Sequence, residues 1–187
     1  CRDIAQKFNN DYKIENFFVV PEPLIKKEFS RIMSLKDGLK KMSKSEVSDL
    51  SRINLTDDKD QIINKIKKAK TDTLPLPSTI EELEKRPEAK NLIGIYSSLM
   101  NNTLQKSIDE FAGKNFSEFK EKLSDVVVNE INPISLKIKE LLDDKVFLEK
   151  ILKDGYEKAN EIASKKIKKI HEIVGFWGYF HKAVPFF

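Results

Sequence analysis

The chain has 187 residues, of which 34% are charged and 40% are apolar, and its formal net charge at pH 7 is +4. This balance excludes a disordered chain, and a net charge this small permits a polyanionic partner without requiring one. A single cysteine, Cys1, excludes an internal disulfide framework, and no apolar run reaches membrane-spanning length. Because glycine is scarce while lysine and glutamate are abundant, we expect a mainly helical, soluble, intracellular protein with no membrane partner.

The first part of the chain predicts one helix and short β-prone runs. In chain order these are a helix over residues 2–10, a β-prone run at residues 17–20 and a short strand at residues 31–35. Asp37-Gly38 is a turn signal that closes the last of these, and residues 39–49 are expected to be a flexible polar stretch.

The start of the sequence is unusual for a natural N-terminus. The first methionine is Met33, yet residues 2–10 already have helical periodicity, with Ile4, Ala5 and Phe8 on one face. We therefore interpret the sequence as a fragment that begins inside a structural element.

From residue 56 onward the periodicity predicts only helices. The predicted segments are residues 56–69, 87–99, 103–111, 116–132, 134–142, 146–152 and 156–174. The proline-rich residues 71–86 between the first two are expected to be a linker with at most one helical turn, and Pro133 should break or kink the longest helix. Three phenylalanines at helical spacing, Phe111, Phe116 and Phe119, are predicted to lie in the core rather than to stack on bases.

The strongest functional pattern is the pentapeptide Lys41-Met42-Ser43-Lys44-Ser45. Two lysines three residues apart on a mobile loop can place ammonium groups against phosphate oxygens, and nearby hydroxyl and backbone N–H groups can donate to the same oxygens. We predict that Lys41 and Lys44 are catalytic groups that act on phosphate oxygens, and that Met42 packs inward to anchor the loop. A solvated lysine-serine loop is the alternative, but the complete pentapeptide between a strand and a helical domain argues against it.

The pentapeptide and its flanks resemble the bacterial tryptophanyl-tRNA synthetases, which are class I aminoacyl-tRNA synthetases. The resemblance extends from residue 2 to about residue 176, and the matching segments are residues 2–5, 31–35, 40–45, 65–72, 86–88, 91–92, 155 and 158–159. It implies that residues 1–49 are the remnant of a Rossmann-type α/β catalytic domain, followed by an all-helical, tRNA-facing C-terminal domain at residues 50–176. Residues 177–187 have no counterpart in the resemblance and stay unassigned.

The same resemblance implies ligands and partners. The backbone of Ile32 would contact adenine, and the loop Lys41, Met42, Ser43, Lys44 and Ser45 would bind ATP, which arrives with Mg²⁺. We expect no separate protein-bound metal site, because Asp57, Asp58 and Asp60 suit a helix N-terminus better. The substrates would be tryptophan, ATP and tRNA, and DNA would not be a partner. The complete enzyme would be a homodimer located in the cytoplasm or in an organellar matrix. The fragment alone, which lacks the amino-acid pocket, is expected to be inactive.

Lysines near the C-terminus are a second candidate site. Lys165, Lys168 and Lys169 flank Ile167 and Ile170 and are candidates for tRNA phosphate contact, although a solvated helix face explains them as well. A surface position is expected for His171, which has no second ligand at metal spacing.

Two alternative functions are left open by the sequence. The chain could belong to a tyrosyl or other class I enzyme, because the pentapeptide is shared across that class, or it could be a stand-alone helical RNA-binding module derived from a synthetase.

Overall fold

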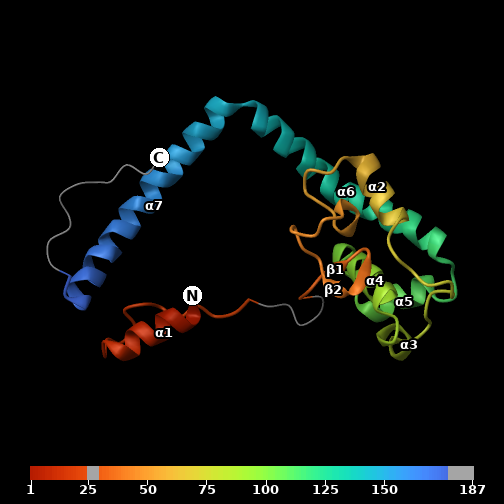
Figure 1. The fold of residues 1–187 in the computed structure, drawn as a ribbon, viewed down its shortest axis with the longest axis horizontal. Helices are drawn as coiled ribbons and strands as arrows, with labels where there is room; N and C mark the ends of the chain where they lie inside the picture. Colours follow the sequence, from red (N-terminus) through yellow and green to blue (C-terminus); the bar gives the residue numbers. More distant parts are fainter. Residues whose placement is uncertain (25–29, 177–187) are drawn as a thin grey trace. The chain divides into compact units, whose positions relative to one another are not determined.

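The computed structural model describes residues 1–24 and 30–176. Its elements are α1 (Arg2–Asp11), β1 (Met33–Ser34), β2 (Asp37–Lys41), the 3₁₀ helix η1 (Asp49–Ser51), α2 (Lys59–Lys67), α3 (Ile80–Glu84), α4 (Pro87–Leu99), α5 (Leu104–Phe111), α6 (Phe116–Asp143) and α7 (Lys145–Val174) (Figure 1). No helix within these described ranges is long and apolar enough to span a membrane. The predicted tail at residues 177–187 lies outside them.

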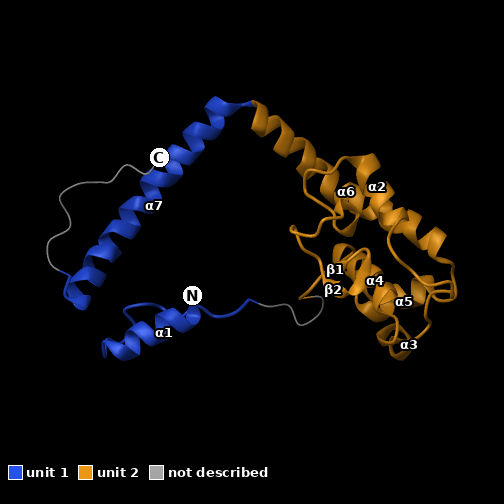
Figure 2. Ribbon diagram, viewed as in Figure 1, with its two compact units in different colours: residues 1–24, 144–187 blue, residues 25–143 orange. Residues whose placement is uncertain are grey.

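The chain divides into two compact units, shown in different colours in Figure 2. One unit consists of Cys1–Leu24 and Asp144–Phe187, and the other of Ile25–Asp143. The second unit holds a hydrophobic core that joins α2, α4, α5 and α6 to the β-hairpin. In its centre the rings of Tyr96, Phe111 and Phe119 meet edge to face, with centroids 4.8–6.0 Å apart. The predicted core positions Phe111, Phe116 and Phe119 are buried, which confirms that prediction.

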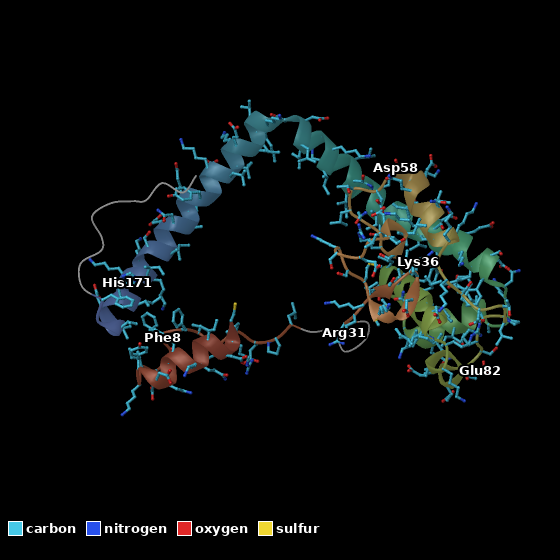
Figure 3. All side chains as sticks on the ribbon, viewed as in Figure 1. Phe8, Arg31, Lys36, Asp58, Glu82 and His171 are labelled. Carbon is cyan, nitrogen blue, oxygen red and sulfur yellow. The ribbon has the colours of Figure 1, made fainter. Side chains whose placement is uncertain are left out.

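Three helices of this core begin within three residues of their predicted starts at residues 56, 87 and 103. Asp58, labelled in Figure 3, caps α2 by accepting a hydrogen bond from the backbone N–H of Gln61, whose side chain accepts one from the N–H of Asp58. Pro87 occupies the first turn of α4, and Thr103 caps α5. The predicted linker contains only the single short helix α3.

Two predicted gaps between helices, at Pro133 and at residues 153–155, are absent from the described residues. Pro133 lies inside α6, which continues to Asp143, and Gly155 lies inside the equally continuous α7. The prediction of separate helices after these residues was wrong. Proline removes one hydrogen bond and glycine costs about 1 kcal/mol in a helix interior, and the turns on either side outweigh such single penalties.

The β-hairpin differs from its prediction at the turn. The turn residues are Leu35 and Lys36, whereas Asp37 and Gly38 already belong to β2, so the predicted Asp37-Gly38 turn was wrong. Gly38 instead allows close packing, because a Cβ atom there would lie 2.6 Å from the backbone of the first turn of α4, at Pro87 and Glu88. The hairpin therefore lies directly against the N-terminus of α4.

In the other unit, residues 17–20 do not form the β structure that their composition favoured. The side-chain amide of Asn9 pairs with the backbone of Phe18, donating to its carbonyl at 2.8 Å and accepting from its N–H at 3.0 Å. This amide takes the place of a neighbouring strand. Phe8 on the predicted helix α1 packs against the rings of Phe17 and Phe18, but Ile4 is 72% exposed and does not share the buried face.

Candidate functional site

The pentapeptide begins at the end of β2 and continues as a loop. Lys41 is the last residue of β2, and the N–H of Met42 donates to the carbonyl of Ile32 at 3.0 Å, which extends the hairpin by one more bond. The Met42 side chain is half-buried and packs against the hydrophobic core, as predicted. The loop thus leaves the sheet from a fixed point, and the predicted flexible stretch was wrong for residues 39–41, which are in the strand.

The three loop residues after Met42 are exposed, and the two serines among them interact with each other. The hydroxyl groups of Ser43 and Ser45 are 2.9 Å apart, and the N–H of Ser45 donates to the Ser43 hydroxyl at 3.3 Å. Lys41 and Lys44 are also exposed, and neither ammonium group has an ion-pair or hydrogen-bond partner among the described residues. Their donors are therefore free to meet an anionic ligand.

A buried side chain of α4 holds β1 in place. Asn91 accepts a hydrogen bond from the N–H of Met33 at 2.9 Å and donates to the carbonyl of the same residue at 2.8 Å. This pairing gives hydrogen-bond partners to the backbone N–H and carbonyl of Met33 on the free edge of β1. Met33 directly follows Ile32, the residue expected to contact adenine. A neighbouring bond runs from the N–H of Leu35 to the carbonyl of Ser51 at 2.9 Å. The hairpin is therefore connected to the helical core on both sides.

Behind the loop lies a polar network that sequence reasoning missed. Lys65 lies at the centre of this network, and its side chain is only 3% exposed. Its ammonium group lies 2.6 Å from a carboxylate oxygen of Asp57 and 2.6 Å from one of Asp49. The hydrogen bond from Lys65, more than any other interaction, holds the pKa of Asp49 below its usual value. A signal was present, because Lys65 occupies the i+3 position of the apolar stripe that starts at Ile62.

The second candidate site lies on α7 in the other unit. Lys168 and Lys169 are exposed, and Lys165, also exposed, forms an ion pair with Glu161 at 2.8 Å. Lys166, between them, is half-buried, because its ammonium group lies 3.7 Å from the ring centroid of Phe17 and donates to the Phe17 carbonyl.

His171, further along α7, was expected on the surface and is half-buried there. Its ring meets that of Phe176 edge to face with centroids 5.5 Å apart.

The anchored hairpin, the lysine-serine loop and the helical core together define a class of protein. Residues 1–132 match the family model of the class I tRNA synthetases for tryptophan and tyrosine, and the chain belongs to this family. Within the family, the chain is 49% identical to the tryptophan–tRNA ligase of Caulobacter vibrioides, with 95% of this chain and 52% of the relative covered. The corresponding ligase of Brucella melitensis is 45% identical, with 93% and 54% covered. The chain spans about half the length of the curated relatives it matches.

Solved structures agree with the fold. Tryptophanyl-tRNA synthetase from Mycoplasma pneumoniae aligns with a TM-score of 0.75 at 24% identity, over 94% of this chain and 51% of that one. The enzyme from Campylobacter jejuni, in complex with ADP and tryptophan, aligns with a TM-score of 0.61 at 27% identity, over 94% and 52%. These neighbours and the largely helical structure confirm the predicted fold class, which is mainly α and resembles that of the tryptophanyl-tRNA synthetases.

Proposed function

We propose that this chain is the part of a tryptophan–tRNA ligase that carries the ATP-binding loop and the helical tRNA-facing domain. The observation that carries the proposal is the pair of exposed, unpartnered lysines in the described loop that leaves the anchored hairpin. The identity to ligases named for tryptophan supports tryptophan over tyrosine as the amino acid. The domain division at residue 49 belongs to the same proposal.

The proposed reaction has two steps. A carboxylate oxygen of tryptophan attacks the α-phosphorus of ATP, the bond from that phosphorus to the bridging oxygen breaks, and pyrophosphate leaves. A hydroxyl group of the terminal tRNA adenosine then attacks the carbonyl carbon of the adenylate, and AMP leaves. Negative charge builds on the departing phosphate groups in the first step, so the protein contributes mainly positioning and electrostatic stabilisation.

The loop residues have distinct proposed roles. Lys41 and Lys44 place positive charge against the β- and γ-phosphate oxygens, where charge develops as pyrophosphate departs. Ser43 and Ser45 exchange their mutual hydrogen bond for bonds to phosphate. The backbone of Ile32, held through its neighbour Met33 by Asn91, faces adenine.

Mg²⁺ is proposed to enter with ATP. No group of three or more potential metal ligands occurs among the described side chains, whereas phosphate oxygens suit Mg²⁺, which keeps part of its water shell and takes few protein ligands. When bound, the ion would neutralise part of the phosphate charge.

The remaining partners follow from the family. We propose that the complete protein binds tRNA, with Lys165, Lys168 and Lys169 as candidate phosphate contacts, and forms a homodimer in the cytoplasm or an organellar matrix. Neither DNA nor a membrane is a proposed partner.

The test is amino-acid-dependent exchange of pyrophosphate into ATP, measured with the full-length protein that contains this chain. We expect exchange with tryptophan and none with tyrosine, and no exchange with either amino acid from the 187-residue chain alone. Exchange with tyrosine would move the protein to the tyrosyl branch of the family. Tight tRNA binding without exchange would support the stand-alone RNA-binding module instead.

A further inference from the structure

The polar network behind the loop has a direct connection to the loop backbone. Arg52, which follows η1, donates from one terminal nitrogen to the carbonyl of Glu46 at 2.9 Å. Its other terminal nitrogen forms an ion pair with Asp49 at 3.0 Å, and its Nε donates to Asn54 at 3.2 Å. Glu46 immediately follows the pentapeptide, so this guanidinium group holds the loop at its C-terminal end.

The network is rooted in a buried ion pair. Asp57 and Lys65 have side chains that are 5% and 3% exposed, and Asp49 bridges from Lys65 to Arg52. Asn54 adds cross-links, because its side-chain amide donates to Asp49 at 3.0 Å and its backbone N–H donates to Asp57 at 2.8 Å. Two cations thus face two carboxylates, and each charge deep in the network has an opposite charge within hydrogen-bond distance.

The charged groups of the loop differ from those of the network behind it in whether their hydrogen-bond donors have partners. Lys41 and Lys44 leave their donors unoccupied among the described residues. Arg52 and Lys65 instead direct donors at Glu46, Asp49, Asn54 and Asp57. A buried ion pair contributes little net stability compared with apolar residues of similar volume, but it fixes geometry because breaking it leaves an uncompensated charge. Such an arrangement suits positioning better than general stabilisation.

We propose that Arg52, with Asp49 and Lys65 behind it, is a positioning element that sets where Lys44 stands when ATP binds. The hydrogen bond from Met42 to Ile32 fixes the loop at its start and the bond from Arg52 to Glu46 fixes it at its end. Residues 43–45 remain as the segment that can move. This inference rests on the proposed ATP-dependent function only for its effect on rate, since the restraint on the loop can be measured without ATP.

The first measurement is cleavage of the full-length protein by a lysine-specific protease, scored after Lys44 by mass spectrometry. Arg52→Met should raise the cleavage rate at Lys44 about fivefold, which corresponds to the loss of a hydrogen bond worth about 1 kcal/mol. A lysine-specific protease is needed because the substitution then removes no cleavage site. Asp49→Asn, at a half-exposed position, should act in the same direction and serves if Arg52→Met does not fold.

The second measurement separates positioning from folding. In tryptophan-dependent exchange, Arg52→Met should lower kcat roughly 10-fold to 100-fold, because small misplacements of a catalytic group have effects of that size. The KM for tryptophan and the thermal unfolding midpoint should change little.

The matched control is Arg86→Met. Arg86 is as buried as Arg52 and likewise joins a carboxylate, Asp72, to backbone carbonyls, those of Leu74 and Pro75, but these partners lie outside the pentapeptide. The Arg86→Met variant should have the wild-type rate of cleavage after Lys44 and the wild-type kcat.

The outcomes are distinguishable. Wild-type cleavage and kcat in both Arg52→Met and Asp49→Asn would overturn the inference, and so would faster cleavage with an unchanged kcat. If the wild-type protein shows no exchange with any amino acid, the proposed function fails, while the cleavage result still decides whether Arg52 restrains the loop.

Discussion

Two lysine-bearing regions of the chain differ in how their charges are held. The loop after β2 carries Lys41 and Lys44 on a hairpin that is connected to the core through Asn91 and Arg52. The helix α7 carries Lys165, Lys168 and Lys169 along a surface with no buried residue in the described part of that helix. A held loop can place a charge against one atom, whereas an exposed helix face can only attract a polyanion through its summed field.

Removing either loop lysine should have the largest effect. We expect Lys41→Ala and Lys44→Ala to lower kcat for tryptophan-dependent exchange in the full-length protein by on the order of 10²-fold or more, because each removes a donor aimed at developing charge. The exposed Lys36 at the hairpin turn, labelled in Figure 3, is the matched control, and Lys36→Ala should exchange at the wild-type rate. Wild-type rates in both loop variants would remove the catalytic role from the pentapeptide.

The anchoring of the hairpin can be broken at Gly38. Gly38→Ala should destabilise the chain by about 1–3 kcal/mol, because its new Cβ would overlap the backbone of Pro87 and Glu88, which cannot move as a flexible side chain could. Gly155→Ala on α7 meets nothing within 4 Å and should instead stabilise its helix by about 0.5–1 kcal/mol. Urea unfolding followed by circular dichroism measures both changes. A neutral or stabilising effect of Gly38→Ala would contradict the close approach at Gly38.

Local signals explain why much of the fold could be predicted from the sequence. Asp58, Pro87 and Thr103 each begin a helix through bonds or backbone angles within a few residues, so a single chain position contains the information. The pentapeptide could be found for the same reason, as its chemistry depends on a spacing of three residues. Gly155 misled the prediction because the cost of one glycine does not exceed the stability of a long helix.

Long-range contacts explain which parts of the candidate site could not be predicted from the sequence. Asn91 meets Met33 across 58 positions, and Lys65 finds a partner in Asp49 only because the chain folds η1 against α2. The role of Gly38 is likewise set by α4, which begins 49 residues later, rather than by its own turn propensity. These residues support the candidate site, yet no local pattern describes their partners.

The core beneath the loop should respond to alkaline pH through Tyr96. Burial, together with a 2.9 Å hydrogen bond to Glu110, raises the pKa of Tyr96 to about 12. Since that pKa is above the unfolded value of 10.0, the stabilisation is complete below pH 10 and is lost as the pH rises towards 12. Tyr96→Phe should lose about 1 kcal/mol at pH 8 and show a shallower decline between pH 10 and 12, measured by urea unfolding at each pH. An equally steep decline in the variant would assign the alkaline loss to other groups.

The α7 lysines should give the smallest effect and the sharpest contrast with the loop. If Lys168 and Lys169 bind tRNA phosphates, Lys168→Gln/Lys169→Gln should weaken tRNA binding a few-fold and reduce the slope of log K against log salt by roughly 0.7–0.9 for each phosphate that is no longer neutralised. Exchange without tRNA should stay at the wild-type rate, because the charge that acts on ATP belongs to the loop.

The exposed Lys150 and Lys153 on the same helix provide a charge-matched control. Lys150→Gln/Lys153→Gln removes the same total charge, so an equal loss of tRNA binding would mean that α7 acts through its net charge alone. A loss confined to Lys168 and Lys169 would mean that even an exposed helix face presents particular lysines to phosphate, and the contrast with the loop would then be one of degree.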